Sequence, residues 1–131
     1  MYLVRKLFVI CLSICILGCE SHEYYAQSMH AVNDFHTLLL QQGICSSIED
    51  CQKKEVVFIS SGRGVHIQIF GVTNLVVLSA IKKQSEELWT SPAMRCVPEF
   101  SVKVYQHSRS EHSLAAKPFQ YYRFSKEKCD A

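Results

Sequence analysis

The sequence lacks the short motifs that mark several common catalytic centres. Its 131 residues contain no Gly-x-Ser-x-Gly elbow, no His-Glu-x-x-His zinc motif and no Cys-x-x-Cys redox pair. It also has little charge of one sign. With 14 Lys and Arg against 12 Asp and Glu, it lacks the cationic excess of nucleic-acid-binding domains. These absences argue against a hydrolase, a thiol oxidoreductase and a nucleic-acid-binding protein, and no motif indicates a cofactor.

The sequence also lacks an apolar run long enough to cross a membrane. The longest, Leu7 to Gly18, has roughly a dozen residues, whereas a transmembrane helix needs about 20. Arg5 and Lys6 precede this run, and Glu20 follows it closely. A basic start before a short apolar stretch is typical of a secretory signal peptide, so we expect residues 1–18 to be removed.

The end of this segment resembles the lipobox of bacterial lipoproteins. In Ile16-Leu17-Gly18-Cys19, an aliphatic residue, a tolerated residue and a small residue precede a cysteine, which is the order of that motif. The resemblance covers only the first 19 residues. It implies that a diacylglycerol is attached to the Cys19 thiol and that a peptidase cleaves between Gly18 and Cys19. A thiol is a good nucleophile for such a transfer.

The lipobox implies attachment to the bacterial cell envelope. Two or three acyl chains anchor a protein essentially permanently, whereas a single chain binds reversibly. Residues 19–23 would then form an acylated tether. Because Glu20 rather than Asp follows Cys19, the resemblance implies an outer-membrane protein that faces the periplasm.

Four cysteines remain after the signal peptide and the lipid-bearing Cys19 are set aside. An even number in an exported chain predicts two disulfides, and four cysteines allow three pairings. We favour Cys45 with Cys51, which closes a short polar loop, and Cys96 with Cys129, which ties the carboxyl end to the domain. A zinc site is the alternative, but the gap between Cys45 and Cys51 is wider than the usual two to four residues. We therefore predict no metal site.

Residues 24–131 predict a single small α+β domain. Apolar residues recur every three or four positions over two segments, 24–42 and 74–89, which indicates two helices. Gly43 would end the first helix. Strands are predicted from β-forming or alternating residues at 56–59, 65–70, 100–105 and 119–124. The order α-β-β-α-β-β favours two helices packed on one face of a four-stranded, mainly antiparallel sheet.

Individual positions within these segments carry further predictions. His30 and His36 are six residues apart and point to different helix faces, so we expect both to be solvated or capping. Residues 45–54 are predicted to be a loop. The buried stripe of the second helix is expected to hold Leu75, Leu78, Ile81, Ser85 and Leu88.

Two polar groups remain as candidates for catalysis. His66 alternates onto the strand face opposite the predicted core. His107, Arg109, Glu111 and His112 lie in a long polar segment that is predicted to be a solvated loop. Neither group stands beside a recognisable nucleophile in the sequence, so a small envelope enzyme using His66 or the His107 to His112 loop is the alternative interpretation.

The last predicted strand offers a candidate docking surface. Its aromatic residues alternate, so one of Tyr121 and Tyr122 should be buried and the other exposed. Arg123 lies beside them, and further cations flank the strand: Lys117, Lys126 and Lys128. Tyrosine and arginine are common at interface hot spots, and an exposed edge strand can pair with a partner strand. Tyr121, Tyr122 and Arg123 are therefore the predicted partner-binding residues.

Together these patterns predict a lipid-anchored, non-enzymatic protein-binding module. An immunity or exclusion lipoprotein and an accessory of envelope assembly both fit this description. The expected partners are the membrane, through the acyl chains, and a protein of the envelope, but no nucleic acid.

Overall fold

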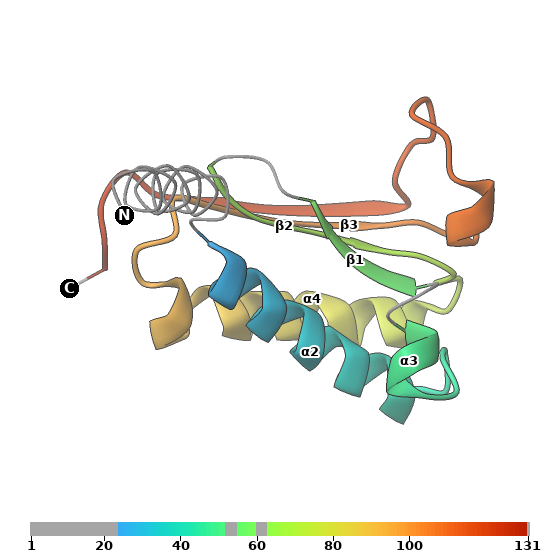
Figure 1. The fold of residues 1–131 in the computed structure, drawn as a ribbon. Helices are drawn as coiled ribbons and strands as arrows, with labels where there is room; N and C mark the ends of the chain where they lie inside the picture. Colours follow the sequence, from blue (N-terminus) through green and yellow to red (C-terminus); the bar gives the residue numbers. More distant parts are fainter. Residues whose placement is uncertain (1–23, 52–54, 60–62, 131) are drawn as a thin grey trace, which may run out of the picture.

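A four-stranded sheet and two long helices form two layers in the computed structural model, which describes residues 24–51, 55–59 and 63–130. Helices α2 (Tyr25–Gln41) and α4 (Leu75–Trp89) both lie against one face of the sheet (Figure 1). The predicted two-layer α+β class is confirmed. The predicted signal peptide, the predicted lipobox at Gly18 and Cys19 and the predicted tether lie outside the described residues.

The sheet runs in the order β1-β2-β3-β4, so β1 and β4 are its edges. Its strands are β1 (Val56–Ile59), β2 (Gly64–Ile69), β3 (Glu99–Val104) and β4 (Gln120–Ser125). The two outer pairs are antiparallel, as predicted, but β2 and β3 are parallel. A parallel pair needs a crossover connection, and α4 supplies it.

The parallel pair begins with a close backbone approach at Gly64. This residue faces Glu99 across the two strands. A Cβ at position 64 would collide with the carbonyl oxygen of Glu99. Glycine is therefore required where β2 meets β3.

Helix α2 ends at the predicted glycine. Gly43 lies just past the helix with a φ of +74°. Its N–H donates to the Leu40 carbonyl over 3.1 Å, and the Ile44 N–H donates to the Leu39 carbonyl over 3.0 Å. These two bonds form a Schellman motif, which satisfies carbonyls at the helix end.

The prediction for the two histidines of α2 is wrong at one position. His30 is exposed and lies 3.6 Å from Asp34. His36 is only 1% exposed, because it follows Phe35 on the stripe that packs against the sheet. Neither ring nitrogen of His36 has a hydrogen-bond partner among the described residues.

Helix α4 starts at a capped residue and differs from the prediction at its first position. The Asn74 side chain accepts a hydrogen bond from the Val76 N–H over 2.7 Å. Leu75 is 69% exposed rather than buried. It lies about 120° around the helix from Ile81, so it points away from the sheet. Val77 takes its place on the buried stripe.

The core fills the space between the helices and the sheet. Strands β1, β2 and β3 contribute its buried apolar residues: Val56, Val65, Ile67, Ile69, Phe100, Val102 and Val104. Towards β4, the rings of Trp89, Phe100 and Phe124 pack against one another, with Phe124 5.7 Å from each of the other two and these two 6.4 Å apart. This stack holds one face of β4 on the core.

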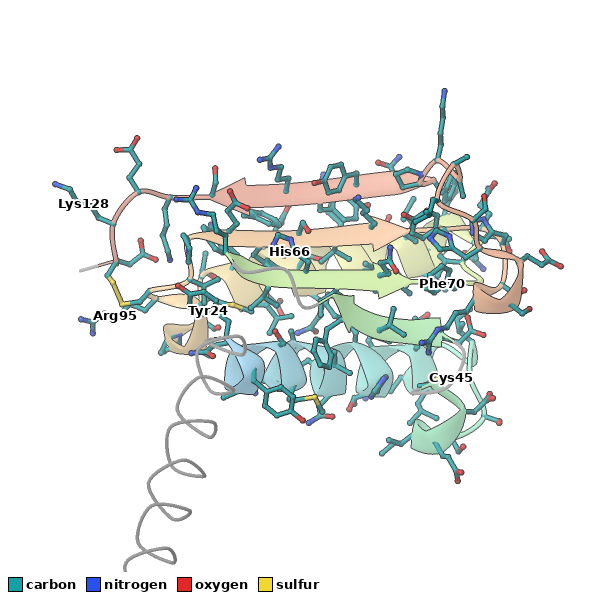
Figure 2. The ribbon with its side chains drawn as sticks, turned by 45° about the horizontal axis from the view of Figure 1, so that its top comes forward. Tyr24, Cys45, His66, Phe70, Arg95 and Lys128 are labelled. Carbon is teal, nitrogen blue, oxygen red and sulfur yellow. A yellow bond between two sulfur atoms is a disulfide. The ribbon has the colours of Figure 1, made fainter. Side chains whose placement is uncertain are left out.

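Both predicted disulfides are confirmed. Cys45–Cys51 is buried and encloses α3 (Ile48–Asp50), one helical turn within the segment that was predicted to be a loop. Cys96–Cys129 lies at the other end of the sheet, where β3 begins and β4 ends (Figure 2). Closing the longer loop removes roughly 3 to 4 kcal/mol of unfolded-chain freedom.

Candidate functional site

The sheet face opposite the helices carries three of the predicted site residues, His66, Tyr121 and Arg123. We call it the open face. The strand registers place its side chains in two rows across β2, β3 and β4: His66, Ser101 and Arg123, then Gln68, Lys103 and Tyr121. Figure 2 shows this face, with His66 near its centre. Each of these residues alternates with a core residue of the same strand.

His66 and Ser101 form a hydrogen-bonded pair in the first row. The His66 Nδ1 lies 2.7 Å from the Ser101 Oγ. Partial burial lowers the pKa of His66; Glu99 opposes this shift, whereas Lys103 and Arg123 add to it. The imidazole is therefore neutral near pH 7, and it forms a hydrogen bond with the Ser101 hydroxyl.

This pair does not have the surroundings of a nucleophile and its base. Ser101 is only 4% exposed, so its hydroxyl is closed to a substrate. The strand that carries it pairs with a neighbour on both sides, and its backbone N–H groups are therefore committed to the sheet. An acyl-transfer centre needs free donors for the developing oxyanion. The geometry fits a packed polar contact.

The two histidines of the His107 to His112 segment are packed, in contrast to the prediction of a solvated loop. The His107 Nε2 lies 3.0 Å from the His112 Nδ1. His112 also lies against Phe70 and Tyr105, with ring centroids 5.1 and 4.7 Å away. The Gly71 N–H donates to the His107 carbonyl over 3.0 Å, which holds the start of the segment beside the end of β2. Its two histidines therefore belong to an aromatic cluster.

The charged residues of the same segment stay at the surface. Arg109 and Glu111 are exposed on η3 (Arg109–Glu111). In the described part of the chain, no three His, Cys, Asp or Glu side chains gather around a possible metal position.

Strand β4 separates its two tyrosines as the alternation predicted. Tyr121 is 47% exposed on the open face, with the Lys103 Nζ 5.1 Å from its ring centroid. Tyr122 is half-buried against the core on the helix side. Burial raises the pKa of Tyr122, and Glu86 of α4 raises it further. Arg123 returns to the open face and is exposed.

The outer edge of β4 carries no neighbouring strand within the described residues. The strand pairs one to one with β3 from Gln120 to Ser125. Backbone bonds hold both of its ends on the β3 side: Phe119 N–H to Val104 over 2.7 Å, and Lys126 N–H to Pro98 over 3.0 Å. The edge is therefore straight, regular and fixed in place.

A shallow hollow of about 470 Å³ lies where β4 ends. It is lined by Arg63, Pro98, Glu99, Ser125, Lys126 and Glu127. Two cations and two carboxylates share this lining, so its charge selects no class of ligand. Lys126 is also engaged elsewhere, at 2.7 Å from Asp130 and 4.3 Å above the Trp89 ring.

Two features of the site escaped the sequence analysis. Lys103 places a cation beside the Tyr121 ring, and the Ser101 hydroxyl is hydrogen-bonded to the Nδ1 of His66. The alternation in β3 placed both outside the core, but only the register of β3 against its neighbours brings them to these partners. The sequence also contains Ser-x-x-Lys twice, from Ser79 and from Ser125. Both serines are exposed, and neither is hydrogen-bonded to its lysine in the described structure.

No family model, curated protein or solved structure matches the chain. Among the described residues, no helix combines the length and the apolar character needed to span a bilayer. The function is therefore inferred from the geometry of the open face and of β4.

Proposed function

We propose that this protein is a non-enzymatic protein-binding module that is anchored to the bacterial envelope by lipid on Cys19. The observation that carries the binding function is the construction of β4. Its helix-side residues, Tyr122 and Phe124, are fixed on the core. Tyr121 and Arg123 are thereby held outward on an unpaired edge. A rigid aromatic beside a cation is the usual composition of an interface hot spot.

The same geometry favours binding over catalysis. Ser101 is enclosed, and the imidazoles of His107 and His112 are committed to each other and to aromatic neighbours. An envelope enzyme would need one of these groups at an accessible surface. The proposed class includes immunity or exclusion lipoproteins, which sequester a protein, and accessories of envelope assembly.

The anchoring part of the proposal is supported by the lipobox and by the two disulfides, which suit an oxidising compartment. Cys19→Ala should abolish palmitate labelling and leave the precursor uncleaved. Cys11→Ala is the matched control, because it removes a thiol from the same segment and leaves Ile16 to Cys19 intact. Normal processing and membrane attachment of the Cys19→Ala protein would show that the lipobox interpretation is wrong.

Site-specific photo-crosslinking in living cells tests the binding part. A photoreactive phenylalanine at position 121 should give a discrete adduct with one envelope protein. The same residue at position 83 serves as the control, because Lys83 is exposed on α4 in the other layer. Mass spectrometry of the adduct would distinguish a sequestered toxin or conjugation protein from an assembly factor. Equal adducts from both positions, or none from position 121, would contradict binding at β4.

A further inference from the structure

We infer that β4 accepts an extended segment of the partner as a fifth strand, and that this segment carries carboxylates on alternate residues. The inference rests on the proposed binding function and specifies the chemistry of the partner. It follows from three features of β4: the direction of its free backbone groups, the charge around it, and the difference between its two sides.

The free backbone groups belong to the residues that face outward. The Lys126 N–H points inward to Pro98, and the ladder alternates along an antiparallel pair. The N–H and C=O groups of Tyr121, Arg123 and Ser125 are therefore directed to the outer edge. These residues also place their side chains on the open face. An added strand would thus form its backbone hydrogen bonds beside Tyr121 and Arg123.

The charge is mainly positive around Tyr121 and Arg123, whereas Glu99 and Glu127 lie near the carboxyl end of the strand. Arg123 lies on the strand, Lys103 lies beside Tyr121, and Lys117 and Lys128 are exposed before and after the strand. Neither Lys103 nor Arg123 forms an ion pair with a described residue. The strand itself contains no acidic residue. A second copy of the chain would bring two cationic edges together, so the complementary occupant is an acidic segment of another protein.

The two sides of β4 impose a pattern on that segment. Side chains of an added strand alternate between the open face and the helix side. On the open face they would meet Arg123, which favours carboxylates. On the helix side they would lie near Tyr122 and Glu86, where a further carboxylate is unfavourable. Acidic residues should therefore occupy every second position.

Synthetic peptides of about eight residues test the pattern, since this length spans β4. The probe alternates Thr and Glu, and the first control has the same composition with the glutamates in adjacent pairs. The second control alternates Thr and Gln. Binding to the purified, processed protein is measured by fluorescence anisotropy. The alternating acidic peptide should bind about tenfold more tightly than either control.

Two further experiments test whether the peptide backbone and Arg123 take part in binding. N-methylation of alternate amides in the probe should abolish binding in one register of methyl groups and leave it intact in the other. Arg123→Glu should weaken binding about tenfold, whereas Lys83→Glu, with the same charge change on α4, should alter it less than about twofold. Circular dichroism would confirm that both variants are folded.

Several outcomes would overturn the inference. Equal binding of the paired-glutamate peptide would exclude the alternating pattern, and equal binding of the glutamine peptide would exclude charge selection. Binding that survives N-methylation in both registers would exclude strand addition. A homodimer that is lost on Tyr121→Ala would identify a second copy as the occupant. If no peptide binds while position 121 still crosslinks to an envelope protein, the strand model fails and the binding function stands. If both fail, the proposed function fails.

Discussion

The two faces of the sheet are formed by neighbouring residues of the same strands but differ in their contacts and chemistry. On β3, Phe100 and Val102 point into the core between the sheet and the helices, while Ser101 and Lys103 lie on the open face. Burial alone does not separate the faces, because Ser101 is almost as inaccessible as Phe100. They differ in chemistry: the covered face is apolar, and the open face is hydrogen-bonded and cationic. Changes to the covered face should reduce stability, and changes to Tyr121 or Arg123 on the open face should weaken binding.

The largest effect is expected on the covered face. Phe100→Ala removes a fully buried ring from the stack with Phe124 and should reduce the free energy of unfolding by about 3 to 5 kcal/mol. Lys103→Ala, three residues along the same strand, should cost less than about 0.5 kcal/mol. Urea unfolding measures both. Similar losses for the two variants would remove the distinction between the faces.

The tyrosine pair tests the same distinction at an edge. Tyr122→Ala should reduce the free energy of unfolding by about 1 to 3 kcal/mol, because the ring packs on the core. Tyr121→Ala should leave stability within about 0.5 kcal/mol of the parent and weaken partner capture. A thermal melt and a capture assay on each variant are sufficient. If Tyr121→Ala destabilises as much as Tyr122→Ala and leaves capture intact, β4 is structural on both sides.

Acid should act on the covered face through His36. Burial lowers the pKa of this histidine, and the Val56 backbone opposes part of the shift although it is outside hydrogen-bond geometry. The unfolded chain therefore binds the proton more tightly than the folded chain. Stability is complete above about pH 6.5 and falls as the pH drops through the folded-state pKa, by at most about 1.4 kcal/mol per pH unit for one proton.

A variant isolates this contribution. His36→Leu should flatten the dependence of unfolding free energy on pH below about 6.5. His66, whose pKa is also lowered by burial, should still contribute a fall in the same direction. An unchanged pH profile in the His36→Leu protein would show that the buried histidine does not control acid stability.

The smallest expected effect is at the polar pair of the open face. Ser101→Ala removes the hydrogen bond to His66 and should cost about 1 kcal/mol. Binding to a partner at β4 should be unchanged. If this variant instead abolished a hydrolytic activity of the purified protein, the enzyme interpretation would replace the binding one.

Much of the fold was predictable because its signals are local. The periodicity of α2, the cap at Gly43 and the alternation in β4 each depend on a few adjacent residues. The pairing of Cys96 with Cys129 was predicted from the even number of remaining cysteines and from the position of Cys129 near the carboxyl end. His36 was predictable in principle, because it adjoins Phe35 on the apolar stripe, but a histidine with no polar partner in a core is uncommon.

The arrangement of the sheet was less accessible from the sequence. The parallel pairing of β2 and β3 depends on contacts between distant segments, although the strand–helix–strand order at α4 carries a signal for it. The neighbours of the site depend on the same pairing. Lys103 meets Tyr121 only because β3 and β4 pair in one particular register.

The Cys96–Cys129 disulfide has a mechanical consequence. It closes β3 and β4 into one covalent ring, and Tyr24, where the described chain begins, lines the same hollow of about 180 Å³ as both cysteines. If the proposed lipid anchor and the proposed added strand are both present, tension between them would enter the domain at this end and run along the strands. Their hydrogen bonds would then be loaded together in shear instead of opening one at a time, and the ring would prevent β4 from peeling away at its carboxyl end.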